Sequence, residues 1–595
     1  MKTFFSSISI DRIVALFFYH RWRQFIDRLT IKTFLPIKWL FFRCFLQMNL
    51  RTSIKIQDEI VKLQDFDLNL CPLLAQQTKI PAKLLQQLSD KDRLIFFERN
   101  THSQWLHDSN PEAAWQEILT WIKSEISYLP ARFPLSWHPY LISKRIQNWI
   151  ALWVLSAPSE HDQEMILRAL WFQATWLNYN FEYDIKGNHL WENAQALALA
   201  GSFLNCPKNS SWVKKGISVL KQQIPLQIHV SGEHFEKSPA YHAELTQGLA
   251  FLLPWIKKSQ ENFYWFENYF SKMKLFSSQI AHPTGILPYF NDTWLTRVTP
   301  NQDFFSDWCG DYYIHRNNTS FFIFDAGNMG SDSLPAHAHC DLLTFELSIR
   351  KLPLILNSGT YSYEGKERQY FRGSSAHNVL TVNNQNCADI WSSFRLGRRG
   401  HITNRGHLTQ SDGVWIWSEH DGYAYLKVPK VLRLCFLSET SDFLCSLFLV
   451  LNHGTNPEIK EHVHLAPEVQ INELETAFFA VKPSLQTSSD GECFFRPLYP
   501  TNTVKIEDTM FSPRFYVQQR KKTLTLNNNE LNSSDEFQLA TAWILNWGKT
   551  DPKIALEFNH QKIKLTWYRN NQPLEAQLHF HQNDYSLFLS AFCAP

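Results

Sequence analysis

The sequence has little net charge and no long apolar run, and each shortage excludes a class of protein. Its 595 residues carry 58 Lys and Arg against 56 Asp and Glu, a formal net charge of +2, so no overall field favours nucleic acid. No stretch reaches the roughly 18 uninterrupted apolar residues that a membrane-spanning helix needs. At this length the chain is expected to hold more than one domain, each with its own core.

The cysteines lack the spacing of a metal site or of a disulfide framework. All ten are scattered between Cys44 and Cys593 without a CxxC pair, so most are expected to be buried free thiols. Asp11 and Arg12 interrupt the region where a secretory signal has its apolar core, which makes the start a poor signal peptide. Residues 1–50 are basic and aromatic, which indicates an amphipathic segment with weak membrane contact.

Aromatic residues are abundant instead, and they divide the chain. They make up 15% of it, and sixteen of the 22 tryptophans precede residue 310. In that part apolar residues recur with helical spacing, and Asn110 with Pro111 forms a good helix start. Repeated helices joined by short breaks favour a helical toroid or solenoid over a compact bundle. The predicted helices include residues 141–155, 165–178, 188–204, 241–256 and 264–279.

Short strands replace the helices after about residue 311. Turn residues such as those at 328–330 and 357–359 separate them, and this pattern predicts an antiparallel β-sandwich. The sequence therefore predicts an α+β multidomain protein with an N-terminal segment, a toroid domain and a β-sandwich domain, at residues 1–50, 51–310 and 311–595. The predicted strands include residues 319–325, 342–349, 414–417, 431–436, 444–451 and 537–545.

Two polar clusters in the helical part exceed what packing requires. One, at residues 187–193, contains Asn188 and His189 at a helix start. The other, at residues 232–242, crowds two histidines, two acids and Tyr241 into a turn that leads into a helix. The alternative for both clusters is ordinary capping of helix N-termini with exposed charges.

The polar stretch at residues 335–378 combines three histidines with tyrosines, arginines and several carboxylates. In an extended chain, side chains two apart point to one face, so His337, His339 and Asp341 share a side if this stretch is a strand. Imidazoles beside a carboxylate on a rigid surface suit acid–base or metal chemistry. The alternative is a polar loop beside ordinary strands.

Four segments resemble the heparinase II/III-like polysaccharide lyases, namely residues 187–193, 233–242, 337–348 and 357–378. Residues 391–399 extend the resemblance, and the order and spacing match over about residues 130–470. The resemblance implies an (α/α) toroid followed by an antiparallel β-sandwich, with the active site in the cleft between them. The implied reaction is β-elimination at a uronic acid unit of an acidic polysaccharide.

In such a reaction a base removes the proton at C5, an acid protonates the oxygen that leaves C4, and donors stabilise the developing charge. The resemblance assigns Tyr241 as base and acid, His337 as an assisting base or donor, and Asn188 with His189 as the groups that neutralise the carboxylate. Glu192 is expected to orient His189, and arginines to bind uronate or sulfate in forked geometry, unless they form a solvated basic turn. The substrate-binding candidates are Glu192, His242, Arg372, Arg395, Arg398 and Arg399.

Some relatives hold a zinc with two histidines and an aspartate, which map to His339, His377 and position 357. Here position 357 is Asn, which offers a neutral oxygen and lacks the charge that favours a dication. A zinc there would be structural, and the reaction itself requires no cofactor. The alternative is a purely hydrogen-bonded cluster of His339, Asn357 and His377.

Three functions stay open at this point. The preferred one is a lyase, because Tyr241, His337, Asn188 and His189 are all retained. The second is a non-catalytic or altered relative that binds or processes polysaccharide in exopolysaccharide or envelope assembly. The third is a glycoside hydrolase, which needs two opposed carboxylates, with candidates Glu192, Glu236 and Asp292.

The partner implied by the resemblance is an acidic polysaccharide, which could be heparan-like, alginate-like or a capsule polymer. The family favours the periplasm or cell envelope, whereas the poor signal peptide favours the cytoplasm. The motifs specify neither the polymer, nor endo or exo action, nor the oligomeric state.

Overall fold

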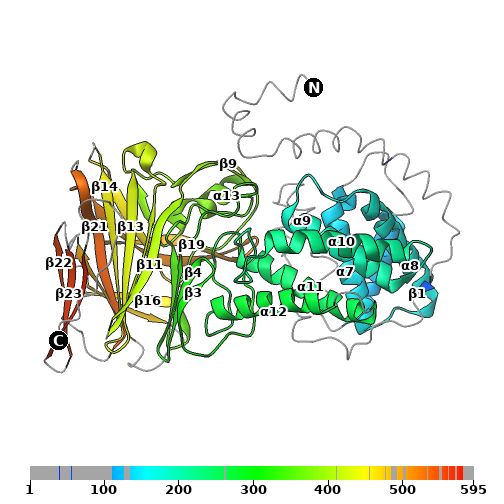
Figure 1. Cartoon of the computed structure of the whole chain (residues 1–595), viewed down its shortest axis with the longest axis horizontal. Helices are drawn as coiled ribbons and strands as arrows, with labels where there is room; N and C mark the ends of the chain where they lie inside the picture. Colours follow the sequence, from blue (N-terminus) through cyan, green and yellow to red (C-terminus); the bar gives the residue numbers. More distant parts are fainter. Residues whose placement is uncertain are drawn as a thin grey trace, which may run out of the picture. The chain divides into compact units, whose positions relative to one another are not determined.

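The structure is a computed structural model whose helices and strands are drawn in Figure 1. The predicted segment 1–50 lies outside the described residues except for Trp39, and the predicted domain boundaries stay predictions. Contacts divide the chain into two compact units: Met1–Glu236 with Ala240–Phe276 and Asp332–Leu334, and Lys237–Pro239 with Ser277–Ser331 and Pro335–Pro595. The structure describes Trp39, Lys55–Ile56 and residues 110–125, 135–259, 263–410, 412–453, 456–475, 478–483, 492–499, 504–531, 534–548, 553–559, 562–569 and 572–579.

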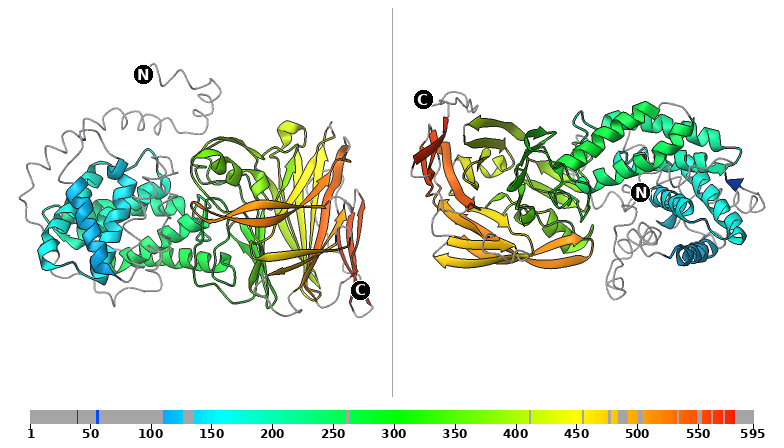
Figure 2. Two further views of the ribbon diagram at one scale, coloured as in Figure 1. Left: turned by 180° about the vertical axis from the view of Figure 1, so that it is seen from behind. Right: turned by 90° about the horizontal axis from the view of Figure 1, so that it is seen from below.

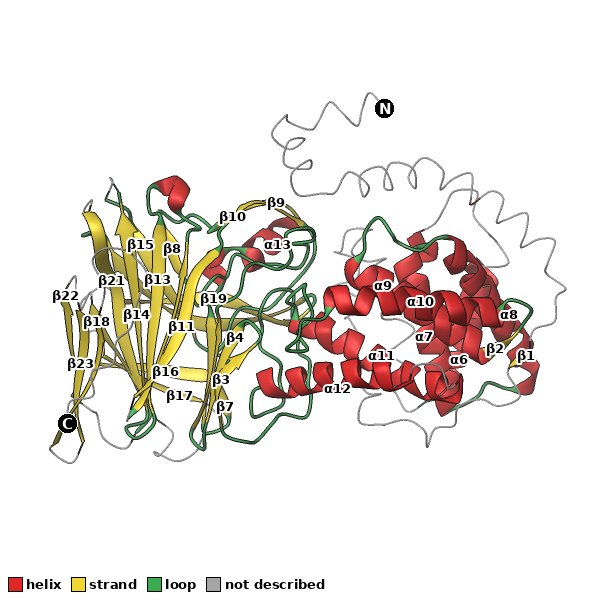
Figure 3. Cartoon of the chain, in the orientation of Figure 1, coloured by secondary structure: helices red, strands yellow, loops and turns green. Residues whose placement is uncertain are grey.

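The first unit is built from helices, as the sequence predicts, and Figure 3 draws them in red. Among the residues that the structure describes, no helix is long and apolar enough to cross a membrane. A two-stranded sheet of β1 (Lys55–Ile56) and β2 (Leu204–Asn205) accompanies them. The helices are α6 (Pro111–Glu125), α7 (Pro139–Leu155), α8 (Glu160–Tyr179), α9 (Gly187–Phe203), α10 (Asn209–Gln227), α11 (Pro239–Ser259) and α12 (Phe263–Ile280).

Helix α10 is missing from the sequence prediction. It buries one face, through residues such as Trp212, Leu220 and Ile224, while lysines, serines and glutamines occupy the rest. Pro225 near its end also resembles a break. The apolar spacing is therefore diluted, although the buried stripe is enough to hold the helix against its neighbours.

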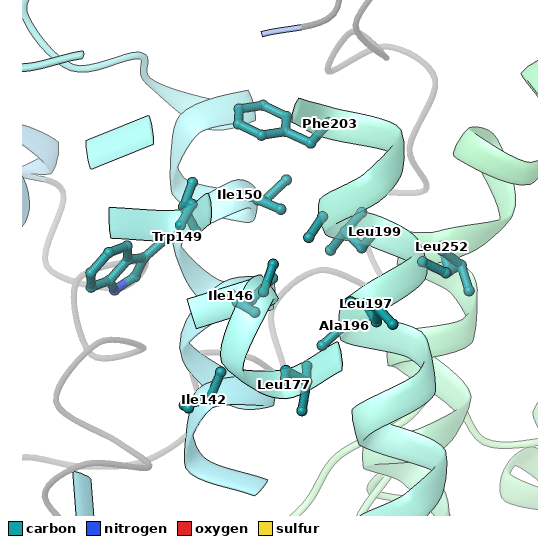
Figure 4. Close-up of a cluster of buried hydrophobic side chains, with 14 of the residues drawn as sticks. Ile142, Ile146, Trp149, Ile150, Leu177, Ala196, Leu197, Leu199, Phe203 and Leu252 are labelled. Carbon is teal, nitrogen blue, oxygen red and sulfur yellow. The ribbon is translucent and has the colours of Figure 1, made fainter. Parts of the chain in front are cut away.

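Helices α7 and α9 form the centre of the core of this unit. Helix α7 is buried from Tyr140 to Trp153, and α9 is buried along most of its length. Figure 4 shows Ile146 and Ile150 of α7 beside Leu199 of α9. A helix buried nearly all round is apolar on every face, which is why the sequence of α9 alternates Ala and Leu.

The second unit consists of antiparallel sheets, and all of its pairings between described strands are antiparallel, as the sequence predicts. The strands of the largest sheet lie side by side in Figures 1 and 2. In sheet order, its eight strands are β11 (Ile402–Gln410), β12 (Gly413–His420), β13 (Lys430–Ser438), β14 (Phe443–Asn452), β21 (Ser534–Asn546), β18 (Cys493–Tyr499), β17 (Phe478–Pro483) and β16 (Val469–Glu475).

Smaller sheets complete the second unit. The five-stranded sheet is β3 (Phe305–Cys309), β4 (Tyr312–Arg316), β5 (Ser320–Asp325), β6 (Phe345–Ile349) and β7 (Leu352–Ile355). The four-stranded sheet is β19 (Val504–Arg514), β20 (Val517–Asn528), β15 (Ile459–His464) and β8 (Leu380–Val382). The others are β22 (Ala555–Asn559), β23 (Lys562–Arg569) and β24 (Gln572–His579), and the pair β9 (Ala388–Ser392) and β10 (Arg395–Arg399).

The eight-stranded sheet is buried on both faces. In β12, Val414 and Ile416 join a core shared with the five- and four-stranded sheets, whereas Trp415 and Trp417 join a core shared with β23. Because side chains alternate between the faces of a strand, every second residue of β12 belongs to the same core. This explains why β12, β13 and β14 are apolar runs without polar alternation.

The polar stretch at residues 335–378 differs locally from the expectation of alternating strands. Residues 335–341 form a loop, and strand β6 begins at Phe345 instead of residue 342. Residues 365–372 form helix α13 (Gly365–Arg372), which the sequence reading missed because a helix of eight residues shows little periodicity. The loop therefore presents its histidines by specific hydrogen bonds and not by the alternation of a strand.

An ion pair buried in the second unit gives a prediction about stability. Arg433 and Glu461 are both fully buried, with Arg433 Nη2 3.0 Å from Glu461 Oε1. Glu461→Gln leaves the guanidinium without its countercharge, so we expect a loss of about 3 kcal/mol in the free energy of unfolding. Calorimetric unfolding measures this loss. The control is Glu458→Gln, which breaks an exposed pair with Lys460 and is expected to lower the free energy of unfolding by less than about 0.5 kcal/mol. Equal losses would contradict the prediction.

Candidate active site

Asn188 and His189 lie in the first turn of α9, and the turn before them is tightly shaped. Lys186 and Gly187 both have positive φ angles, of 64° and 54°. The N–H of Asn188 donates to Glu236 Oε1 at 2.8 Å, which ties the start of α9 to the turn that precedes α11. A Cβ at Gly187 would overlap this carboxylate, so only glycine fits there without displacement.

His189 is held by a buried carboxylate from the preceding loop. Its Nδ1 lies 2.8 Å from Glu182 Oε1, and its ring stacks on Tyr140 with centroids 4.3 Å apart. Burial alone would raise the pKa of Glu182, but His189 and His138, with hydrogen bonds from His189 and Asn193, lower it to about 2. Glu182 is therefore ionised near neutral pH and orients a histidine whose side chain remains 27% exposed.

The prediction that Glu192 orients His189 is wrong, because Glu182 does so. Glu192 is 1% exposed and bonds to Lys144 Nζ and, at 2.6 Å, to Gln147 Nε2. It lies more than a turn inside α9, on the face that meets α7. Both oxygens are engaged there, so the structure does not support its predicted contact with substrate either.

Tyr241 and His242 begin α11 and point in different directions, since neighbours on a helix lie about 100° apart. Tyr241 is 4% exposed. His242 is turned into the core, with Nε2 3.0 Å from the carbonyl oxygen of Met273, and burial lowers its pKa to about 4. The predicted substrate contact of His242 is therefore corrected to a packing role.

The second unit gathers its polar side chains around Asp292. The carboxylate is fully buried and accepts hydrogen bonds from His337 Nδ1 at 2.9 Å, from His339 Nε2 at 2.8 Å and from both terminal nitrogens of Arg368. Burial alone would raise the pKa of Asp292, but Arg368 and the two histidines hold it well below its usual value. Asp292 is therefore an anion that accepts hydrogen bonds from three side chains.

The backbone around Asp292 is joined to the histidine loop. The N–H of Asp292 donates to the carbonyl of His337 at 3.1 Å, and the N–H of His339 donates to Asn291 Oδ1 at 2.9 Å. Asn291 adopts a φ of 54° and also donates through Nδ2 to the carbonyl of Lys237. These bonds fix the loop at residues 335–341 where its sequence alone gives no regular structure.

The arginines predicted to bind substrate differ in their burial and in their partners. Arg372 is fully buried and donates to the carbonyls of Pro335, Ala338, Ser392 and Ser393, so its predicted substrate contact is corrected to a structural role. Arg395 and Arg398 lie nearer the surface of the second unit, whereas Arg399 is buried. Arg398 pairs with Asp389 at 2.7 Å and covers the ring of Tyr425, Arg399 is 7% exposed, and Arg395 is exposed.

The residues predicted to hold zinc are close together but do not face one point. His339 Nδ1 lies 3.2 Å from His377 Nε2, whereas Asn357 Oδ1 lies 3.1 Å from the other ring nitrogen, His377 Nδ1. Asn357 Oδ1 also accepts from Thr344 Oγ1 and from the N–H of Asn378. Tetrahedral zinc needs its ligands around one centre, so this set does not fit a shared zinc and matches the hydrogen-bonded alternative.

Sequence reasoning missed the partners of both histidines. Glu182 precedes His189 by seven residues across a loop. Asp292 lies 45 residues from His337 and 76 from Arg368, and it was noted only as a candidate hydrolase acid at a loop. No local spacing marks such pairs, because they meet only through the fold. Asp341 is also buried, and burial raises its pKa to about 7.

Comparisons with known proteins place the chain in a family. The profile of the heparinase II/III N-terminus matches residues 93–319, and that of the heparinase II/III-like C-terminal region matches residues 299–543. Together the two profiles span more than half of the chain, so the chain belongs to the heparinase II/III-like family. The predicted resemblance is thereby confirmed.

Two curated relatives are heparin-sulfate lyases. The one from Bacteroides stercoris is 28% identical over 320 residues, which is 45% of this chain and 46% of the relative. The one from Pedobacter heparinus is 26% identical over 299 residues, 42% of this chain and 44% of the relative. The matched region thus spans less than half the length of these curated relatives.

Solved structures share the fold. A heparinase III structure has a TM-score of 0.65 and 17% identity, covering 92% of this chain and 97% of that one. A heparan sulfate lyase from Pedobacter heparinus has a TM-score of 0.56 and 16% identity, covering 92% and 94%. A helical region followed by antiparallel sheets is therefore the fold of this chain and of these structures.

Gly187 gives a prediction about the start of α9. Gly187→Ala places a side chain against Glu236 and Leu334 in a backbone conformation that alanine disfavours, so we expect a loss of about 2–5 kcal/mol. Gly365→Ala is the matched control, because it also has a positive φ but its Cβ would approach only Glu367, at 3.1 Å. It is expected to lose about 1–2 kcal/mol. Thermal unfolding, with hydrogen exchange at residues 187–193, distinguishes them, and identical behaviour would contradict the role of Glu236.

Glu182 gives a prediction about pH. Its folded pKa of about 2 lies below the usual 4.5, so its stabilisation is present above pH 4.5 and is lost as the pH falls toward 2. Glu182→Gln should remove at most about 3 kcal/mol at neutral pH and flatten the acid limb of stability. Tryptophan fluorescence reports unfolding of the Trp-rich first unit. Glu164→Gln, in an exposed pair with Arg168, should leave that limb unchanged, and an unchanged limb in Glu182→Gln would refute the assignment.

Proposed function

We propose that this protein is a polysaccharide lyase that cleaves a uronate-containing acidic polysaccharide by β-elimination, and that its helical unit is an (α/α) toroid. The observation that carries the proposal is the position of Asn188, His189 and Tyr241 in the first turns of α9 and α11. The helix dipole favours negative charge at such positions. The heparin-sulfate lyase relatives support the same reaction class.

The proposed reaction assigns each step to a side chain of this protein. Tyr241, as phenolate, removes the proton at C5, and the electron pair forms the C4–C5 double bond while the C4–O bond breaks. Tyr241 or His337 then protonates the leaving oxygen. Asn188 donates to the uronate carboxylate, and His189, in its charged form beside ionised Glu182, balances the charge that develops there. The products are a chain with an unsaturated uronate end and a chain with a new hydroxyl.

No step of this mechanism passes through a metal. The arrangement of His339, Asn357 and His377 does not fit a shared zinc, and elimination needs a proton acceptor, a proton donor and charge stabilisation, all of which side chains of this chain can supply. These three residues instead support the loop that carries His337.

The substrate proposed here is a weakly sulfated or unsulfated uronate polymer. Arg372 is committed to main-chain carbonyls and Arg398 to Asp389, so two of the cations expected to bind sulfate are engaged within the protein. Forked arginine contacts are the usual means of binding sulfate tightly. Arg395, which is exposed, remains the candidate for a contact with the polymer.

The hydrolase alternative needs a carboxylic acid that is protonated near neutral pH beside a second carboxylate. Asp292 is held ionised by Arg368, and Glu192 is bonded to Lys144. Glu236 accepts the N–H of Asn188. The three candidates are thus placed as hydrogen-bond acceptors, which favours elimination over hydrolysis. The binding-only alternative is left to experiment.

Ultraviolet absorbance of the unsaturated uronate tests the proposal. Purified protein is incubated with heparan sulfate, desulfated heparan, alginate and hyaluronan, and absorbance is expected to rise on at least one weakly sulfated polymer. Tyr241→Phe should reduce the rate by about 10²–10⁴-fold, and His337→Ala by a similar order, because each removes a proton-transfer group.

The matched control is His242→Gln, the neighbour of Tyr241 that faces the core, whose rate should stay within about threefold of the wild type once folding is verified. New reducing ends without absorbance would point to hydrolysis. Polymer binding without cleavage would favour the binding role. Absorbance that survives Tyr241→Phe would remove Tyr241 from the mechanism.

A further inference from the structure

The carboxylate of Asp292 has each of its oxygens occupied by two donors. Oδ1 accepts from His339 Nε2 and from Arg368 Nη1, and Oδ2 accepts from His337 Nδ1 and from Arg368 Nη2, the last two at 2.9 Å each. Such a carboxylate accepts hydrogen bonds and has no proton to donate. Each group that faces it must therefore bring its own hydrogen.

This requirement determines where the proton of His337 lies. Because Nδ1 faces Asp292 Oδ2, Nδ1 carries the hydrogen, and in the neutral ring the lone pair is then on Nε2. A neutral imidazole free in water can exchange between its two tautomers, whereas this ring is buried and has one of them selected.

We propose that Asp292 is the positioning residue of His337: it selects the Nδ1–H tautomer and the ring orientation, so that Nε2 is the nitrogen presented for proton exchange with the substrate. The catalytic part of this inference rests on the proposed lyase function. The assignment of the tautomer does not depend on that function, because it follows from contacts within the second unit.

The surroundings hold Asp292 rigidly enough for this task. Arg368 is fully buried, with its guanidinium 5.0 Å from the ring centre of Tyr363 and 5.8 Å from that of Phe394. Its Nε donates to the carbonyl of Ser393 at 2.9 Å. A guanidinium fixed on three sides presents two parallel N–H groups to the carboxylate, which determines the plane of the carboxylate and hence the direction of Oδ2.

The main chain adds a second constraint on the same pair. The N–H of Asp292 bonds to the carbonyl of His337, and Ser238 Oγ donates to the carbonyl of Asp292 at 2.6 Å. Backbone and side chain of Asp292 thus both engage His337. The backbone bond fixes the main chain of His337 and the side-chain bond fixes its ring, which is how a supporting residue fixes the geometry of a catalytic one.

Nitrogen-15 NMR of histidine-labelled full-length protein tests the inference, with the His337 signals identified by their loss in His337→Gln. Pyrrole-type and pyridine-type nitrogens have well-separated shifts, and His337 is expected to show the first at Nδ1 and the second at Nε2. In Asp292→Ala no carboxylate oxygen faces Nδ1, so His337 should lose its selected tautomer and show shifts averaged between the Nδ1–H and Nε2–H forms.

Lyase assays of the same proteins give the catalytic consequence. For Asp292→Ala we expect kcat to fall by about 10²–10⁴-fold while KM stays within about threefold, because the ring then lacks the carboxylate that selects its tautomer and orientation. Glu461→Gln is the control, since it neutralises another fully buried carboxylate of the same unit that pairs with an arginine. It should leave the tautomer of His337 unchanged.

The outcomes separate the two proposals. A wild-type His337 protonated on Nε2, or an Asp292→Ala protein that keeps Nδ1–H as its single tautomer, overturns the positioning role, and the wild-type spectrum decides even where the variant does not fold. A kcat loss no larger than that of Glu461→Gln also overturns it. A wild type with the expected tautomer that cleaves no polymer overturns the proposed function and not the tautomer assignment.

Discussion

The buried charge of Asp292 is the constraint on which the polar part of the second unit depends. A carboxylate removed from water must recover its lost hydration through countercharge and hydrogen bonds, and Asp292 does so with Arg368 and two histidines. Meeting that demand brings together a loop at residues 291–292, the loop at residues 335–341 and helix α13. The loop that carries His337 has no strand ladder of its own, so these bonds replace one.

His189 of the first unit and His337 of the second unit are oriented in the same way, in different electrostatic surroundings. His189 and His337 each direct Nδ1 at a buried carboxylate, Glu182 and Asp292 respectively. Asp292 also pairs with Arg368, and the permanent positive charge of the guanidinium already balances the negative charge of the carboxylate. Glu182 is instead surrounded by His189, His138 and the amide of Asn193. The first arrangement suits a ring that exchanges a proton, and the second suits one that balances a uronate.

The sequence predicted the change from helix to antiparallel strand because burial leaves a period in the residues, and helices α7 and α9 with strands β12 to β14 are the clearest cases. Helix α10, with one buried face, and α13, with eight residues, lack such a period and were missed. Motifs located Asn188, His189, Tyr241 and His337, whose roles stay predictions. Glu182, Asp292 and Arg368 have no local signal, since their meaning depends on residues brought close by folding. The substrate contacts predicted for His242 and Arg372 were wrong for the converse reason, because the motif gives the position of a residue but not the direction of its side chain.

The protonation states of the buried carboxylates bear on the reaction class. A hydrolase assigns proton donation to a carboxylic acid, whereas Glu182 and Asp292 are held as anions by the groups around them. Asp341 is the exception, because burial raises its pKa to about 7, but it is 3% exposed and accepts a backbone N–H from Asn291. Glu182 and Asp292 therefore orient and balance other groups. The proposed elimination assigns proton transfer to imidazole and phenol side chains instead of to these two anions.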